Sequence, residues 1–151
     1  MLRNRLNDAL KDAMKAKEAH ATSTLRLILA ALKDRDIAER GKGNGEGVGD
    51  QAILEMLQKM VRQRHDSIEM YTKGGREDLA KREADEIEVI ERFLPKQMDE
   101  MDMRAAIDGV ISELEAGSVK DMGRVMSTLK ERYPGRMDFG KASGIVKEAL
   151  V

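Results

Sequence analysis

Residues 25–32 read LRLILAAL, and the predicted fold is built around this segment. Every residue in it except Arg26 is apolar. A helix that is apolar nearly all round is normally covered on more than one side. The stretch therefore predicts a central helix with neighbours on two sides. Thr22 or Ser23 can accept the capping hydrogen bond at its start, and the pattern continues to about Arg40.

Three further helices are predicted around this central one. Apolar residues recur at helical spacing over about residues 2–18, 50–72 and 77–93. Asp50 is a suitable cap for the second of these helices. Pro95 ends the third, because the residue before a proline is pushed out of the helical region.

Glycine occupies every second position of residues 41–49, which read GKGNGEGVG. The entropy cost of ordering so many glycines predicts a mobile loop. A phosphate-binding loop is the alternative interpretation. However, the segment lacks the G-x-x-x-x-G-K-[ST] pattern and follows a predicted helix rather than a strand.

Three more helices are predicted in the last third of the chain. Asp99, Ser118 and Asp138 each precede an apolar helical pattern and can act as its N-cap. The first of these helices is expected to end at Gly117. Residues 133–135, Tyr-Pro-Gly, separate the other two.

The fold class that follows is all-α. We expect a four-helix N-terminal domain over residues 1–95 and a smaller three-helix domain over residues 98–151. The composition agrees, because proline occurs only twice and the aromatic residues that strands favour make up 3% of the chain.

Several classes of protein are excluded by composition. The chain has no cysteine, so it can form neither a disulfide scaffold nor a thiolate metal site. No apolar run approaches the roughly 20 residues that cross a bilayer, so no membrane partner is expected. The first residues form no apolar leader, and Asp8 and Asp12 argue against a transit peptide. These observations predict a cytoplasmic protein.

Candidate catalytic residues are scarce. His65 and Glu69 stand one helical turn apart, but a zinc site needs a third protein ligand, which no spacing supplies. No serine lies in a G-x-S-x-G elbow. We therefore expect no catalytic residue, metal or cofactor, and hence a protein that is not an enzyme on its own residues.

Charge is distributed unevenly along the chain. The 27 basic and 28 acidic side chains give a net charge of −1, but residues 96–116 carry −4 and residues 117–151 carry +3. The basic residues of the last segment lie off its apolar stripes. They are Lys120, Arg124, Lys130, Arg132, Arg136, Lys141 and Lys147. Spaced positive charge of this kind suits a phosphate backbone, although solvated helix faces look similar.

Gly123 and Arg64 are two further residues whose positions predict a specific contact. Gly123 costs about 1 kcal/mol within a helix, which suggests close approach of a helix or of a ligand backbone. Arg64 lies in line with apolar residues, so we expect it to be half-buried and paired with Glu83 or Glu86. An anion or RNA contact is the alternative role for Arg64.

Taken together, these features resemble the bacterial YqeY family. The motifs are Thr24-Leu25-Arg26, Arg62-Gln63-Arg64-x-x-Ser67-Ile68-Glu69-x-Tyr71, Gly75-Arg76-x-x-Leu79, Phe93-Leu94-Pro95, Met122-Gly123-x-x-Met126, Gly135 and Val146-Lys147-Glu148-x-Leu150. The resemblance implies an all-helical protein of four plus three helices. Its C-terminal part is similar to the tail domain of the B subunit of tRNA-dependent amidotransferases, which helps to hold the tRNA.

The resemblance implies a function as well. Those amidotransferases are carbon–nitrogen ligases with glutamine as amido donor, and their catalytic domain is separate from the tail. We therefore expect a non-catalytic accessory protein that binds RNA, above all tRNA. The alternative is a protein-interaction module that docks on an amidotransferase or an aminoacyl-tRNA synthetase through an apolar, methionine-rich surface.

Overall fold

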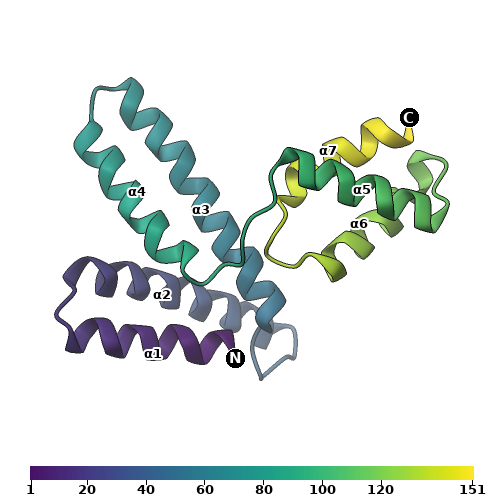
Figure 1. Cartoon of the computed structure of the whole chain (residues 1–151). Coiled ribbons are helices and arrows are strands. Elements are labelled where there is room, and N and C mark those ends of the chain that lie inside the picture. Colours follow the sequence, from purple (N-terminus) through teal and green to yellow (C-terminus); the bar gives the residue numbers. More distant parts are fainter. The chain divides into compact units, whose positions relative to one another are not determined.

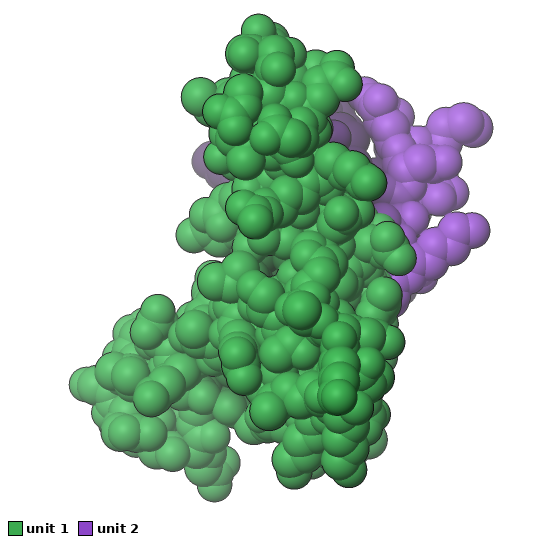
Figure 2. All heavy atoms as spheres, turned by 90° about the vertical axis from the view of Figure 1, so that its left-hand side faces the viewer, with its two compact units in different colours: residues 1–94 green, residues 95–151 purple.

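A computed structural model describes residues 1–151, and it is all-helical, as expected (Figure 1). The helices are α1 (Leu2–Lys15), α2 (Ala19–Gly41), α3 (Asp50–Lys73), α4 (Glu77–Glu91), α5 (Glu100–Leu114), α6 (Met122–Arg132) and α7 (Phe139–Leu150), with a short 3₁₀ turn η1 (Val119–Asp121) before α6. The chain forms two compact units, residues 1–94 and residues 95–151, which Figure 2 colours separately. No helix combines the length and the apolar character needed to cross a membrane.

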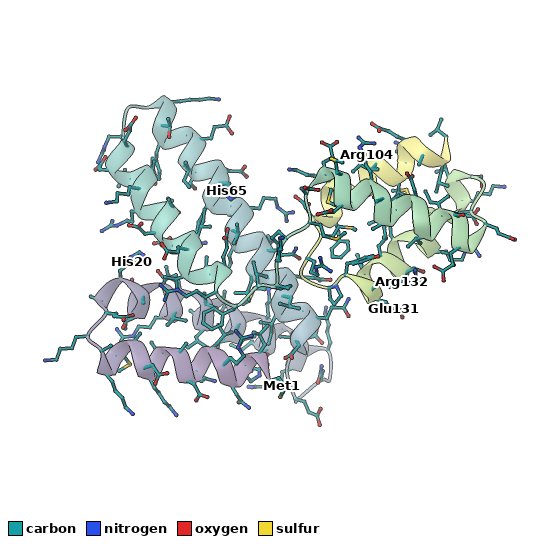
Figure 3. All side chains as sticks on the ribbon, in the orientation of Figure 1. Met1, His20, His65, Arg104, Glu131 and Arg132 are labelled. Carbon is teal, nitrogen blue, oxygen red and sulfur yellow. The ribbon has the colours of Figure 1, made fainter.

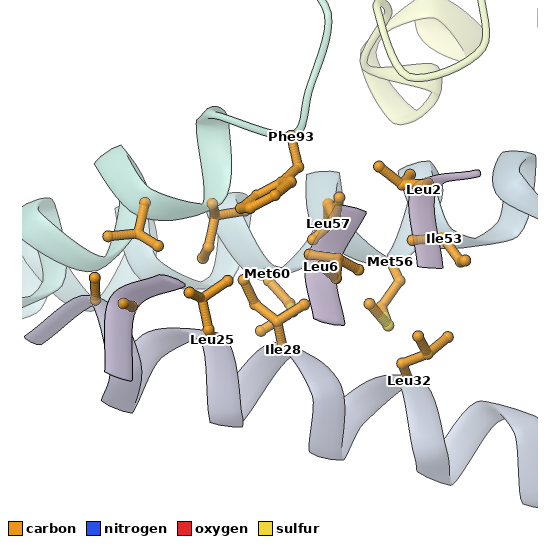
Figure 4. Close-up of a cluster of buried hydrophobic side chains, with 14 residues drawn as sticks. Leu2, Leu6, Leu25, Ile28, Leu32, Ile53, Met56, Leu57, Met60 and Phe93 are labelled. Carbon is orange, nitrogen blue, oxygen red and sulfur yellow. The ribbon is translucent and has the colours of Figure 1, made fainter. Parts of the chain in front are cut away.

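Unit 1 (residues 1–94) is built around one apolar core that all four of its helices share. Figure 4 shows side chains from α1, α2 and α3 meeting in this core, together with Phe93 just after α4. The labelled members are Leu2, Leu6, Leu25, Ile28, Leu32, Ile53, Met56, Leu57, Met60 and Phe93. Burying each large aliphatic side chain contributes about 1.5–3 kcal/mol, so this cluster is the main stabilising element of the unit.

The central helix, α2, is less enclosed than its sequence predicts. It packs on α1, α3 and α4, and Leu25, Ile28 and Leu32 are buried. Leu27 and Ile37 are nevertheless 46% and 52% exposed. One face of α2 is therefore core, and the opposite face is open to solvent.

The start of α2 also differs from the expected cap at Thr22 or Ser23. The helix begins at Ala19, so its N-cap position is occupied by Glu18, four residues before Thr22, and Glu18 makes no side-chain capping hydrogen bond. Thr24 is thus an interior residue, and its Oγ1 is buried without a hydrogen-bond partner. Packing against the core, rather than a local cap, decides where this helix begins.

The glycine-rich segment is anchored at its C-terminal end rather than loose along its whole length. Arg3 in α1 donates two hydrogen bonds to the Asp36 carboxylate of α2, from Nη1 over 2.6 Å and from Nη2 over 2.9 Å. The backbone N–H of Val48 donates to the same carboxylate at 3.0 Å, and Arg3 Nη2 donates to Val48 O at 3.0 Å. Asp36 therefore joins α1, α2 and the entry to α3.

A close approach at this anchor depends on glycine. Gly47 has φ +85°, and a Cβ there would lie 2.5 Å from Asp36 Oδ1. By contrast, nothing lies within 4 Å of a Cβ built at Gly41, Gly43, Gly45 or Gly49. Only one of the five glycines is therefore required by packing.

Unit 2 (residues 95–151) has its own core, formed by α5, α6 and α7. Its fully buried side chains include Ile107, Leu129, Met137 and Val146. Two of the predicted caps are confirmed, both in unit 2, whereas Gly49 and not Asp50 occupies the N-cap position of α3. Asp99 accepts a hydrogen bond from Asp102 N in a capping box, and Asp138 accepts from Gly140 N and Lys141 N.

The connection between α5 and α6 differs from the prediction. Helix α5 ends at Leu114 rather than Gly117, because Glu115 adopts a left-handed conformation with φ 53°. Ser118 makes no capping hydrogen bond, and η1 replaces the expected first turn of the sixth helix. The Asp121 carboxylate instead accepts a hydrogen bond from Gly117 N at 3.0 Å, which closes the turn.

Residues 95–98 are expected to separate the two domains, and the structure places them in unit 2. Gln97 Nε2 donates to Gly135 O at 2.6 Å, and Met98 N donates to Arg136 O at 2.8 Å. This segment is thus bonded to the turn between α6 and α7.

Candidate nucleic-acid interface

The seven basic residues predicted to contact phosphate are all exposed in unit 2. Lys120 lies in η1, Arg136 lies in the turn between α6 and α7, and the others lie on those two helices. The α6 residues are Arg124, Lys130 and Arg132, and the α7 residues are Lys141 and Lys147. Their contacts divide them into three groups, which are the arginines of α6, Lys141, and the remaining four cations.

The two arginines of α6 turn toward α5. Arg132 Nη1 donates to Glu113 Oε2 at 2.6 Å, and Arg124 Nη2 donates to Leu114 O at 3.1 Å and Asp121 Oδ1 at 3.2 Å. The hydrogen bond from Arg132 is the main reason why the pKa of Glu113 lies below its usual value. Both guanidinium groups therefore already have acceptors within unit 2, and Glu113 neutralises Arg132.

Lys141 lies in acidic surroundings. It lines a surface hollow beside the N-terminal end of α5, together with Arg104, which pairs with Glu100, and four carboxylates. The carboxylates are Asp99, Glu100, Asp138 and Glu148. This lysine is consequently a weak site for an anion.

The remaining cations are less compensated. Lys120, Lys130 and Lys147 are exposed and form no ion pair, while the Nε of Arg136 donates only to the Lys96 backbone O at 3.3 Å. The ammonium of Lys130 lies 6.0 Å from the ring centroid of Phe139, the first residue of α7. Lys130 is thereby placed on the α7 side of α6, away from the arginines.

A glycine accompanies a lysine on each helix of this hairpin. Gly123 precedes Lys130 by seven residues in α6, and Gly140 precedes Lys147 by seven residues in α7. Seven residues are about two helical turns, so each glycine and its lysine lie on the same side of their helix. All four are exposed, and α6 packs against α7.

We call the set of exposed residues Lys120, Gly123, Lys130, Gly140 and Lys147, which lie on η1, α6 and α7, the hairpin surface. It combines positive charge with two positions that have no side chain. Nothing lies within 4 Å of a Cβ built at Gly123, so no helix makes the close approach considered for this glycine. Close approach of a helix is therefore ruled out for Gly123, and approach by a ligand stays a prediction. Gly140 was not singled out from the sequence, although the repeated spacing from glycine to lysine is visible there.

The interhelical arginine of unit 1 lies as the sequence predicts. Arg64 is 14% exposed, and its Nε donates to Glu86 Oε2 at 2.8 Å and lies 4.0 Å from Glu83 Oε2. Its Nη1 donates to Met60 O at 3.1 Å. Burial, aided by the nearby Glu86 charge, raises the pKa of Glu83 above its usual value. The geometry is that of a structural ion pair between α3 and α4.

The two histidines lie apart. Figure 3 labels His20 on α2 and His65 on α3, and both side chains are exposed. Glu69, the neighbour of His65 in the sequence pattern, pairs with Lys73 at 3.2 Å. The structure shows no group of three or more His, Asp or Glu side chains that could hold a metal ion.

Comparison with known proteins gives one family and several relatives. The profile of the family described as Yqey-like protein matches residues 3–150. Curated relatives named "Altered inheritance of mitochondria protein 41, mitochondrial" include one from Lachancea thermotolerans, 34% identical over 112 residues, which are 73% of this chain and 58% of the relative. One from Saccharomyces cerevisiae is 31% identical over 103 residues, which are 68% of this chain and 51% of the relative. The chain spans about half the length of the curated relatives it matches.

These names correct one expectation. The residues predict a cytoplasmic protein, whereas the relatives are named as mitochondrial proteins. The prediction is wrong because the composition of a folded domain records how it packs and not the compartment in which it works.

Proposed function

This chain belongs to the YqeY family, and from that premise we propose that it is a non-catalytic accessory protein that binds structured RNA, with tRNA as the first candidate. The observation that carries the proposal is the hairpin surface. Its three lysines are exposed and form no ion pair. The resemblance of this region to the tRNA-holding tail of amidotransferases supports the same conclusion.

A phosphate binds most readily to charges that need not first lose a partner. A lysine ammonium acts as a flexible point charge and suits a backbone contact that carries no base specificity. Lys120, Lys130 and Lys147 form no ion pair that a phosphate contact would have to break. Arg124 and Arg132 would have to exchange hydrogen bonds that they already make, so they contribute less than the sequence suggests.

The two glycines of the hairpin surface also favour binding of RNA. A position without a Cβ lets a ligand backbone come close to the helix. Gly123 and Gly140 lie two helical turns before Lys130 and Lys147. Contacts to phosphate and ribose predict binding that depends strongly on salt and little on base sequence. The proposed role is therefore to bind the backbone of an RNA and not to recognise its base sequence.

A non-catalytic role is supported by the side chains that are present. The chain has no cysteine and two exposed histidines on different helices. Carbon–nitrogen ligase chemistry belongs to the catalytic domain of the amidotransferases. The likeness to those enzymes extends only to their tail.

The test is a titration of labelled tRNA with the full chain at several salt concentrations. The test variant combines Lys120→Gln, Lys130→Gln and Lys147→Gln. A matched control makes the same change at three exposed lysines of unit 1 that form no ion pair, namely Lys11, Lys59 and Lys81. A third variant, Lys141→Gln, probes the acidic hollow.

We expect the triple variant to lower the slope of log K against log salt by about 2, because each phosphate contact contributes about 0.7–0.9. The unit 1 control and Lys141→Gln should retain most of the wild-type affinity. If the two triple variants bind tRNA equally well, the hairpin surface is not the binding site. If wild-type binding does not depend on salt, the phosphate mechanism is wrong.

The competing function is docking on an amidotransferase or an aminoacyl-tRNA synthetase. Exposed methionines such as Met70 and Met101, at 73% and 80% exposure, are the feature that favours it. Co-purification with and without nuclease separates the two functions, because a partner bound directly through protein contacts survives digestion of RNA.

A further inference from the structure

The solvent face of α2 carries a row of basic residues that the proposed RNA contact does not use. Arg26, Lys33 and Arg40 follow one another at intervals of seven residues and are exposed. Seven residues make about two turns and about 10 Å of helix, so the three side chains lie along one edge of α2. None of them forms an ion pair, although the charge of Arg40 helps to lower the pKa of Asp36.

An apolar stripe runs beside this basic row. Leu27, Ala30 and Ile37 are all exposed on the side of α2 opposite its buried residues. At the N-terminal end the stripe opens into a surface hollow lined by Leu27, Arg26 and the half-exposed Met14 of α1. A basic edge beside an apolar stripe is the pattern of a helix that accepts an amphipathic helix.

We propose that this face, Met14 with residues 26–40 of α2, docks an acidic amphipathic helix of a partner protein. Acidic residues at seven-residue spacing on the partner would pair with Arg26, Lys33 and Arg40, while its apolar stripe covers Leu27, Ala30 and Ile37. The proposal concerns unit 1 and does not depend on RNA binding by unit 2.

Charge complementarity selects this occupant over the others. In an antiparallel pair of α2 helices from two copies of the chain, the basic row would face its own counterpart, and like charges would repel. A nucleic acid would use the basic row but would leave Leu27 and Ile37 exposed. A membrane surface would have to accept Asp34, which lies in the apolar stripe and is exposed.

Asp34 also makes the proposal specific. It stands between Ala30 and Ile37 along the stripe, so a partner helix must place a polar or basic residue opposite it. This single carboxylate fixes the register of the partner helix, because a shift by one turn would bring apolar or acidic residues against it.

The experiment is photo-crosslinking of the full chain in its native host. Ala30 is replaced by the photoreactive residue benzoylphenylalanine, and Ala84, an exposed alanine of α4, is replaced in a control protein. Adducts are digested, and the attached peptides are sequenced. The same experiment is repeated with Arg26→Glu, Lys33→Glu and Arg40→Glu combined, and with the milder glutamine substitutions at the same positions.

We expect the Ala30 adducts to concentrate on one protein segment that has acidic residues seven apart beside an apolar stripe. Charge reversal should lower the adduct yield at least tenfold, and the glutamine variant should lower it by a smaller factor, with the helical circular dichroism of both variants unchanged. Adducts to a second copy of this chain, to RNA or to lipid would overturn the proposal. So would a yield equal to that of Ala84, or a yield that both sets of substitutions leave unchanged.

Discussion

Asp36→Ala tests the anchor that joins α1, α2 and the entry to α3. The substitution removes the acceptor for Arg3 Nη1 and Nη2, at 2.6 and 2.9 Å, and the acceptor for Val48 N at 3.0 Å. Asp34→Ala is the matched control, because Asp34 is an exposed aspartate of the same helix and forms no ion pair.

The expected loss can be worked out from these contacts. A two-pronged ion pair whose side chains are 33% and 19% exposed contributes about 1 kcal/mol after solvent screening. Leaving Val48 N without its acceptor adds about 1 kcal/mol. The free energy of unfolding of unit 1 should therefore fall by about 2 kcal/mol, which lowers the midpoint of thermal unfolding by about 10 °C for a unit of this size. Asp34→Ala should change it by less than about 0.5 kcal/mol.

The pH dependence provides an independent check. The hydrogen bond from Arg3 is the main cause that holds the pKa of Asp36 below its usual value. A lowered folded-state pKa gives stability that is present above the unfolded-state pKa, about 3.9, and is lost as pH falls through the folded-state pKa. Urea unfolding should thus show a constant gap between wild type and Asp36→Ala from pH 7 to about 5, narrowing below about pH 4. Equal stability of Asp36→Ala and Asp34→Ala at pH 7, or a gap that widens in acid, would show that Asp36 does not anchor these helices.

Three further predictions concern buried and half-buried polar groups of unit 1. Glu86→Gln should destabilise the unit by about 1–3 kcal/mol at pH 7, because it leaves the Arg64 guanidinium without its main partner. Glu83→Gln should instead raise the free energy of unfolding at pH 7. The pKa of Glu83 is raised in the folded state, so the stability that its protonated form contributes is complete below the unfolded-state pKa and is lost as pH rises. The neutral amide keeps that stability at pH 7 and should have no effect below about pH 4. Thr24→Val should raise the free energy of unfolding by about 1 kcal/mol, because it removes a buried hydroxyl without a partner, and a loss of stability would show that the hydroxyl is satisfied in solution. Chemical denaturation measures all three effects.

Local signals in the sequence predict local structure well. Asp99 and Asp138 are identified as caps because an N-cap bonds to residues two or three positions away. Thr22 and Ser23 are wrongly predicted as caps because α2 is extended toward its N-terminus by packing of Ala21 and Leu25 into the core. Ser118 is also wrongly predicted as a cap, because the Asp121 carboxylate accepts the hydrogen bond that closes that turn.

Contacts between helices are harder to foresee. The pair of Arg64 and Glu86 is predicted because both lie on amphipathic helices joined by a short turn, which limits the possible neighbours. The bonds from Arg3 to Asp36 and from Arg132 to Glu113 join residues 33 and 19 positions apart and have no sequence pattern. The candidate interface is therefore predicted as a set of exposed cations. Its division into arginines with acceptors and lysines without ion pairs depends on how α5, α6 and α7 cross.

The anchor at Val48 has a consequence for the length of the glycine-rich segment. Asp36 holds the segment from Gly47 onward, while a Cβ built at Gly43 or Gly45 would meet nothing within 4 Å. Doubling the length of a flexible loop costs only about 0.6 kcal/mol of closure entropy. Extra residues inserted next to Gly45 would disturb the hydrogen bonds of Asn44 to Glu39, Glu46 and Gly47 but should leave both flanking helices in place. This position is therefore suitable for inserting a fluorophore, an epitope or a tether.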